Sequence, residues 1–405
     1  MKPDLIGESK LRSKPNTVIS KFAAAIALLM AITFFTTAQA QITTAIRGVV
    51  VNQQDEAVTD ASVKITHTAS GTVSLATSNE NGVFSARGLR VGGPYSVEIS
   101  GSGFSAVRID DLYLALDRTL NLPVTIEAEA AIEEVRVVAT RQSVGYKNQG
   151  LGTDLGIEAL EEVASIDRDI TDAAAQNPFA IINVQSGGAK ELTIAGANNR
   201  FNSLTVDGVA LNDRFGLNAN GYPTQRSPIS YDAIESLSIQ TAPFDVEYNG
   251  FTGGTINAVT KSGTNEFFGS LAYYSTDDSL VGDKNKERDF DFTFEEETLV
   301  ATLGGPIIQD KLFFFVAYDK YEEVAPLSNG PVGSGALNIR EGITLDDVAE
   351  VGQIVSDVWG FDIGGFSKEP AEDEKILANI DWNISDAHRA KFTYISTEGN
   401  TIREQ

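Results

Sequence analysis

Residues 231–270 constrain the fold of this chain more than any other stretch. A β-forming run over 233–240 is followed by the pair Gly253-Gly254 inside a second apolar run, then by a turn-like segment and a new β-forming run over 267–274. Paired glycines inside a strand let another backbone approach closely, or they mark a bulge. The stretch therefore predicts a tightly packed β domain, and a soluble β-sandwich could use the same pattern.

Two blocks of motifs resemble the plug domain of TonB-dependent outer-membrane receptors. The upstream block consists of 192–196 (LTIAG) and 203–209 (SLTVDGV). The residues that match the end of the plug are Ile234, Glu235, Gly253, Gly254, Ile256, Asn257 and 259–263 (VTKSG). Residues 240–248 depart from the usual plug pattern in the way that the Oar-like subgroup of these receptors does. The resemblance implies a plug that sits in the lumen of a barrel.

Composition excludes several classes of site. The chain has no Cys, so neither disulfides nor thiolate metal sites can form. Its two histidines, His67 and His388, are far apart in the sequence, so the common zinc ligand sets are missing. The net charge of −25 argues against a nucleic-acid partner, because binding phosphates requires Lys and Arg. The sequence thus predicts no metal, no cofactor and no nucleic acid.

Residues 1–40 have the pattern of a secretory signal peptide. Basic residues precede an apolar core at 22–35, and Ala38-Gln39-Ala40 forms an A-x-A cleavage site. The apolar core is shorter than the ~20 residues that a spanning helix needs, which disfavours an N-terminal membrane anchor. We expect cleavage after Ala40 and export from the cytoplasm.

Residues 42–126 predict a small β-sandwich, because short β-branched runs alternate closely with glycine turn signals. The expected strands are 46–51, 61–67, 73–78, 83–86 and 95–100. The segment resembles the carboxypeptidase regulatory-like domain, which carries no catalytic residues of its own, so we expect a spacer or docking module. His67 lies at a strand end and is expected to be structural or solvated.

Residues 127–150 predict a linker with one extractable strand. The segment Glu133, Glu134, Val135, Arg136, Val137 and Val138 resembles the TonB box, the contact point for the inner-membrane energy-coupling protein. An extended, β-branched segment can add to an exposed sheet edge of a partner through main-chain hydrogen bonds. The alternative is that the run is simply the first strand of the plug.

Residues 151–265 are the expected plug domain, of α+β type. Short helices are predicted at 156–163 and 170–175, with Asp169 or Thr171 as the cap of the second. Asp207-Gly208 is expected to be a turn rather than a catalytic or metal-binding pair. In the polar loop 212–228, aromatic and amide side chains could bind a substrate or could instead pin the loop. The candidate substrate-binding residues are Arg214, Phe215, Asn218, Asn220 and Tyr222.

Residues 266–405 predict long amphipathic strands. The runs 289–295 and 376–384 alternate strictly between apolar and polar residues, which is typical of transmembrane β-barrel strands. Tight turns are expected near 304–311 and 385–388, and a long loop with a helix at 345–358 separates two strands. The expected residues of an aromatic girdle at the membrane interface are Phe313, Phe314, Phe315, Tyr318 and Tyr321.

The sequence thus predicts a mainly β chain: a small β-sandwich, then an α+β plug domain, then the first strands of an incomplete transmembrane β-barrel. The resemblance implies an Oar-like TonB-dependent receptor in the outer membrane of a Gram-negative cell. Its expected partners are a TonB-type inner-membrane protein, outer-membrane lipid and a transported substrate that the sequence leaves open. No bond in the substrate is made or broken, so we expect no enzyme activity.

Two further expectations follow. Receptors that hold a plug use barrels of about 22 strands, so the sequence predicts that this chain is a fragment of such a receptor. The alternative function, from a different class, is a secreted or surface-attached β-sandwich adhesion or binding protein, which could use the same signal peptide and the same regulatory-like domain. Solubility without detergent would favour this alternative.

Overall fold

The computed structural model describes most of the chain after residue 42. The described residues are 43–116, 118–128, 135–138, 152–165, 168–184, 190–213, 215–216, 218, 220–224, 226–241, 251–280, 282, 294–324, 329–336, 338–362, 371–385 and 388–400. The predicted signal peptide, the first two residues of the TonB-box-like segment (Glu133 and Glu134), Arg214 and most of the run 289–295 lie outside these residues. Among the described residues, no helix combines the length and the apolar character needed to cross a membrane.

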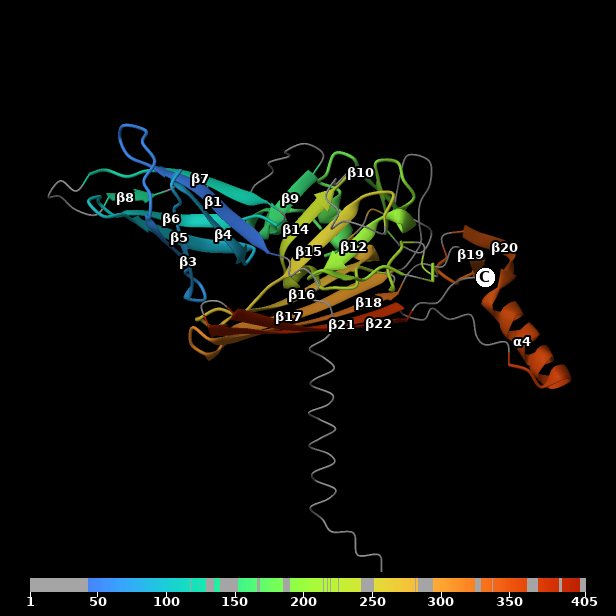
Figure 1. Ribbon diagram of the computed structural model, residues 1–405. Coiled ribbons are helices and arrows are strands. Elements are labelled where there is room, and N and C mark those ends of the chain that lie inside the picture. The colour runs from blue at the N-terminus through green and yellow to red at the C-terminus, as the bar shows by residue number, and fades with distance from the viewer. Residues whose placement is uncertain are drawn as a thin grey trace, which may run out of the picture. The chain divides into compact units, whose positions relative to one another are not determined.

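Three groups of strands follow one another along the chain (Figure 1). The regulatory-like module contains β1 (Thr44–Val51), β2 (Ser62–His67), β3 (Thr72–Thr77), β4 (Val83–Leu89), β5 (Gly92–Ser100), β6 (Val107–Leu114) and β7 (Thr119–Thr125), followed by β8 (Val135–Val138). The plug contains β9 (Gly152–Gly156), α2 (Ile157–Glu162), α3 (Ile170–Ala174), β10 (Ala180–Val184), β11 (Lys190–Ile194), η1 (Asn199–Phe201), β12 (Ser203–Val206), β13 (Val209–Ala210), η2 (Tyr231–Ala233), β14 (Ile234–Gln240) and β15 (Thr255–Thr260). The remaining elements are β16 (Phe268–Asp277), η3 (Asp278–Leu280), β17 (Glu295–Ile308), β18 (Leu312–Val324), β19 (Asn329–Val332), β20 (Asn338–Thr344), α4 (Leu345–Trp359), β21 (Ala371–Ser385) and β22 (His388–Asn400).

The regulatory-like module is a sandwich of two sheets, with strand orders β4-β1-β7 and β3-β2-β5-β6-β8. Its core is apolar and includes the fully buried Phe84 and Tyr95. The five strands expected from the sequence are confirmed, but β6 and β7 were not expected. In β6 the alternation breaks at Asp111, a residue with φ of +61° beside a register shift against β5. In β7, Pro123 interrupts the sequence pattern of a strand. Proline is tolerated there because β7 is an edge strand, which pairs with β1 among the described strands.

The plug is built on a five-stranded sheet of order β13-β12-β15-β14-β9, with the hairpin β10-β11 and the short helices α2 and α3 beside it. Both predicted helices are present, and the Asp169 side chain caps α3 by accepting from the Thr171 amide. The turn at Asp207-Gly208 is confirmed, with φ of +46° and +79°. The plug has a hydrophobic core of its own, which includes Leu155, Leu204 and Ile256.

Strands β16, β17, β18, β21 and β22 form one antiparallel sheet, which we call the wall (Figure 1). The connections β17–β18 and β21–β22 are short and lie at one end, whereas β18 and β21 are joined at the other end through β19, β20 and α4. The mainly β fold and the wall strands agree with the sequence prediction.

Two details of the wall prediction were wrong. Residues Gly304 to Pro306 lie inside β17, and the turn follows that strand at 309–311; Pro306 is accommodated at a register shift near the strand end. Phe313, Phe315 and Tyr321 are buried instead of belonging to an interfacial girdle, because their alternate positions place them on the inner face of the sheet.

The regulatory-like module offers a test of its close packing. A Cβ at Gly48 would lie 2.1 Å from the Leu122 carbonyl oxygen and 2.5 Å from the Phe84 ring, whereas at Gly101 the nearest atoms are 3.4 Å away. We expect Gly48→Ala to lower the free energy of unfolding of the module (residues 43–128) by about 1–3 kcal/mol, because overpacking displaces neighbouring backbone. Gly101→Ala is the matched control and should change it little. Urea denaturation measures both, and equal effects would contradict the assigned packing.

Candidate functional site

The inner face of the wall carries buried polar residues among apolar ones, whereas its outer face is exposed and largely apolar. In β21 the alternate residues Asp373, Lys375, Asn379 and Asp381 are at most 4% exposed. The alternate residues on the other face include Ile376, Ile380, Trp382 and Ile384, which are 40–51% exposed. A soluble sheet buries its apolar residues, so this order is reversed. Apolar residues outside and polar residues inside are typical of a transmembrane barrel wall.

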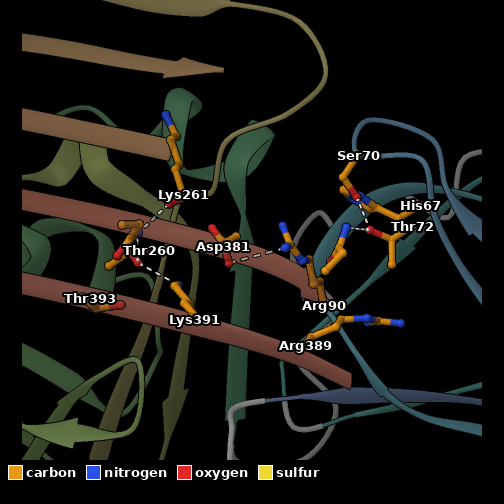
Figure 2. A network of polar contacts seen from close by, with 12 residues as sticks. His67, Ser70, Thr72, Arg90, Thr260, Lys261, Asp381, Arg389, Lys391 and Thr393 are labelled. Carbon is orange, nitrogen blue, oxygen red and sulfur yellow. Dashed lines mark hydrogen bonds and ion pairs between the residues drawn. The ribbon is translucent and has the colours of Figure 1, made fainter. Parts of the chain in front are cut away.

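Asp207, in the turn between β12 and β13, connects the plug to this inner face. Its carboxylate lies 2.9 Å from the Lys391 ammonium group and accepts a hydrogen bond from the Thr393 hydroxyl at 3.3 Å, both on β22. Within the plug it also accepts from the amide and hydroxyl of Thr260, at 3.1 and 2.5 Å. The carboxylate is therefore held by two plug groups and two wall groups at once (Figure 2 shows Lys391 beside Thr260).

The Val-Thr-Lys-Ser-Gly motif is the second connection. Asn379 on β21 donates to the Thr260 hydroxyl at 2.7 Å and to the Lys261 carbonyl at 2.8 Å. Two residues later, a Cβ at Gly263 would lie 2.3 Å from the Phe314 carbonyl oxygen. The glycine of the motif is thus required for close approach of the chain to the wall backbone. In contrast, Gly253 and Gly254 make room for the Asn202 and Ile194 side chains of the plug itself.

A cluster of buried charges is the third connection. Arg226 of the plug loop lies 3.7 Å from Asp319 on β18 and 4.0 Å from the centre of the Tyr321 ring. On β21, Lys375 lies 3.8 Å from Asp319 and 3.4 Å from Asp373. Within the described part of the chain, the carboxylate oxygens of Asp319 accept no hydrogen bond, so long ion pairs alone compensate this buried charge.

Asp169 lies beside this charged cluster in the plug. Its carboxylate accepts from the Ser227 amide at 3.0 Å and from the amide and hydroxyl of Thr171. Burial opposes ionisation of Asp169, but the hydrogen bonds from Thr171 and Ser227 and the nearby Arg226 guanidinium outweigh it and lower its pKa. The helix cap therefore also stays charged and fixes the loop that presents Arg226 to the wall.

Apolar contact between plug and wall is small by comparison. One buried cluster combines Ala233 of the plug with Phe315, Ala317 and Leu377 of the wall. The core of the plug is a separate and larger cluster. Ile395 of β22 packs against both clusters, but the buried residues of the plug core come from the plug, so the plug can part from the wall largely by exchanging polar contacts while its own fold stays intact.

The residues predicted to bind a substrate differ in their exposure to solvent. Phe215 is 89% exposed, whereas Asn220 and Tyr222 are buried. The amides of Asn218 and Asn220 donate to the carbonyls of Tyr222 and Thr224, each at 3.0 Å, and so fix the loop. Burial raises the pKa of the Tyr222 hydroxyl, which belongs to the plug core. The substrate-binding role stays a prediction, and among the described members of this set Phe215 is the most open to a ligand.

The TonB-box-like segment supplies strand β8. It pairs in parallel with β6 at the edge of the module sheet, with register partners Val107–Val135 to Asp110–Val138. The segment is therefore an edge strand of the regulatory-like module and is not part of the plug sheet, whose first strand is β9. Its contact with a coupling protein stays a prediction.

Sequence reasoning missed the residues that join plug and wall. Asp207 was interpreted as a turn residue alone, and Arg226, Asn379, Lys391 and Thr393 were not singled out. One signal was available: the isolated Lys391 in β22 and Asn379 in β21 lie at inward positions of strands whose opposite faces are apolar. A charged or amide side chain at such a position needs a partner, but the sequence does not identify it.

Domain-family models match three consecutive parts of the chain. They are the carboxypeptidase regulatory-like domain at residues 45–127, the TonB-dependent receptor plug domain at 158–255 and an outer membrane beta barrel domain at 259–333. The TonB-dependent transporter Oar of Myxococcus xanthus is 28% identical over 335 residues, which cover 76% of this chain and 29% of Oar. The probable TonB-dependent siderophore receptor PirA of Acinetobacter baumannii is 26% identical, with coverage of 58% and 30%.

Among solved structures, the siderophore receptor PirA from Acinetobacter baumannii aligns with a TM-score of 0.42 and 18% identity, covering 62% of this chain and 31% of that one. The chain spans less than a third of the length of these curated relatives. Its three matched domains, together with the similarity to Oar, show that the chain is Oar-like and carries the regulatory-like, plug and outer-membrane barrel domains of a TonB-dependent receptor, in that order.

Proposed function

We propose that this chain contributes the regulatory-like module, the plug and the first wall strands of an outer-membrane receptor that moves a substrate through a plugged barrel. The observation that supports it best is the polar contact between plug and wall, in which Asp207 and Thr260 of the plug meet Lys391 and Asn379 of the wall. The opposite face of the same strands is apolar, which suits contact with lipid. A sheet with these two faces separates a polar lumen from a membrane.

The kind of contact suits a plug that must move. Hydrogen bonds and ion pairs between plug and wall can exchange for bonds to water when the plug shifts, so each contributes only about 0.5–3 kcal/mol of net stability. A continuous apolar core would instead have to be exposed as a whole. Among the described residues, apolar contact with the wall is limited to the cluster around Ala233 and to Ile395 beside the plug core, which favours movement of the plug as a unit.

The energy for this movement comes, in our proposal, from a TonB-type inner-membrane protein that binds the segment Glu133–Val138. Strand β8 has one partner, β6, so its other edge is open among the described residues. A partner strand can add to such an edge or replace β6 through main-chain hydrogen bonds. The transport step breaks no bond in the substrate, so the chain is not an enzyme in this proposal.

The substrate binds, in our proposal, at the plug loop that exposes Phe215. An exposed aromatic ring on a loop held by Asn218 and Asn220 gives a ligand a rigid surface on which to stack. The relative PirA is named as a siderophore receptor, so ferric siderophores are the first class to assay. Binding that survives Phe215→Ala unchanged would remove this residue from the site.

The plug–wall contact can be tested through Lys391. Ala233→Cys serves as a reporter, because Ala233 is fully buried against the wall and the chain has no other cysteine. We expect Lys391→Met to raise the rate of maleimide labelling roughly tenfold, since Asp207 loses its cation. Lys320→Met is the matched control, because Lys320 pairs with Glu322 on its own strand and is 40% exposed. Equal labelling in both variants would rule out the assigned contact.

The coupling segment can be tested by proline substitution. Val135→Pro removes a main-chain donor from β8, so we expect at least a roughly tenfold loss in capture of a purified TonB periplasmic domain. Ser143→Pro, in the same linker but outside the box-like run, is the control and should be captured normally. Undiminished capture of Val135→Pro would reject the assignment of Glu133–Val138.

The membrane-facing surface can be tested at Ile380, in the middle of β21. A lysine there would cost about 2–4 kcal/mol near the bilayer midplane, so Ile380→Lys should reduce recovery in carbonate-washed outer membranes. Glu374→Lys exchanges one exposed charge for another near the strand end and is expected to be recovered normally. Recovery of the unmodified protein in the detergent-free soluble fraction would favour a secreted adhesion protein instead.

A further inference from the structure

Three cross-strand pairs of β21 and β22 lie in a row on the inner face of the wall. The pairs are Asn379–Thr393, Asp381–Lys391 and Asn383–Arg389. Each strand contributes alternate residues, so all six side chains leave the sheet on the same side. The row runs toward the short connection between the two strands, and its successive pairs meet different parts of the chain.

The last pair of the row binds the regulatory-like module. Asn383 donates to the Thr72 hydroxyl at 2.8 Å. The Arg389 guanidinium donates to the Ser74 hydroxyl at 2.7 Å and to the Gly88 carbonyl at 3.2 Å. The module therefore meets the wall through its strands β3 and β4, which are remote in sequence from β22.

The two residues of the middle pair, Asp381 and Lys391, bind different parts of the chain. Lys391 pairs with Asp207 of the plug at 2.9 Å, whereas Asp381 pairs with Arg90 of the module at 3.4 Å. Figure 2 shows Arg90 directed at Asp381 and, on the neighbouring strand, Lys391 beside Thr260. At this one cross-strand pair, β22 therefore binds the plug through Lys391 and β21 binds the module through Asp381.

The module also contacts the plug directly. Arg118, just before β7, forms an ion pair with Asp154 in β9. The space that a Gly92 side chain would need is filled by the carboxylate of Glu235, the acidic residue of the plug motif. Burial raises the pKa of Glu235, although Lys261 and Lys391 oppose this. The contact thus encloses a plug carboxylate.

Two buried residues of the module, His67 and Tyr95, lie within electrostatic reach of Arg389 on the wall. His67 is buried, bonds to the Ser70 hydroxyl at 2.7 Å and packs against the Tyr95 ring with centroids 4.8 Å apart. Burial, assisted by the charges of Arg90 and Arg389, lowers the pKa of His67 to about 3. Burial likewise raises the pKa of Tyr95 to about 12.

We propose that the regulatory-like module is a clasp, which docks on the wall and the plug together and holds the plug in its resting position. The same row of wall residues binds both, so each neighbour orders the side chains that the other uses. Strand β8 belongs to the module sheet, so a pull on it reaches the module before it reaches the plug. This role rests on the proposed transport function, in which short barrel turns face the periplasm, where TonB acts.

The docked position is tested by cross-linking the whole chain. Thr72→Cys with Asn383→Cys should react rapidly with a short bismaleimide to give an intramolecular product. Thr77→Cys with Asn383→Cys is the matched control, because Thr77 is the other end of β3, about 17 Å further along the strand. Equal yields from the two pairs, or no product from the first, would overturn the docking.

The charged contact is tested in the Thr72/Asn383 cysteine background. Arg90→Asp and Asp381→Arg alone should each slow cross-linking about tenfold, and the double exchange should restore it. Arg47→Ala, which removes an exposed arginine elsewhere on the module, should have no effect. Restoration by the double exchange separates a direct contact from misfolding, and failure to restore would overturn the assigned pair.

The clasp itself is tested by a change in the plug. Asp207→Ala alters no residue that touches the module, yet it should slow cross-linking of Thr72→Cys to Asn383→Cys several-fold, because Lys391 and its neighbours lose their order. Unchanged cross-linking would show that the module is only a neighbour of the plug and would overturn the clasp. These experiments use neither a TonB protein nor a substrate, so their outcome is independent of whether the capture by TonB succeeds.

Discussion

A carboxylate that is largely shielded from water needs partners within the protein, and the arrangement of this protein depends on the contacts of Asp207, whose side chain is 12% exposed. Two of its partners are plug groups of Thr260, and two are Lys391 and Thr393 on β22. The wall has the complementary need, because its inner face carries amides and charges that the sheet alone cannot satisfy. The plug and the inner face of the wall therefore supply each other's polar partners. Without the other, the polar groups of each would lack these partners where water is excluded.

The same constraint explains why the wall can face two environments. Period-two alternation sends Asn379 and Asp381 inward while Ile380 and Trp382 point outward. A shift of one residue in register would exchange the faces, exposing charges to lipid and burying isoleucine against a polar plug. The long antiparallel pairing of β21 with β22 fixes this register and so positions every inward contact.

The regulatory-like module also supplies polar partners to the inner face of the wall. Its contacts use the inward positions next to those that hold the plug, namely Asp381, Asn383 and Arg389. A module that served only as a spacer would not need Arg90 beside the buried carboxylate of Asp381. The module combines a packed sandwich of its own with a polar docking surface, which allows it to attach and detach without unfolding.

Much of this protein follows from its sequence alone. Local patterns determined the mainly β fold, most strands of the module, the short plug helices with the Asp169 cap, the Asp207-Gly208 turn and the amphipathic wall strands, because these depend on turn chemistry and on alternation within a few residues. The partners of Asp207, Arg226 and Lys391 were decided only by the tertiary structure. These contacts join residues more than 50 positions apart, and the need of a shielded charge for a partner names no particular residue in the sequence. Strand β8 shows the same limit: its sequence predicted an extended segment, and only the fold assigned it to the edge of the module sheet.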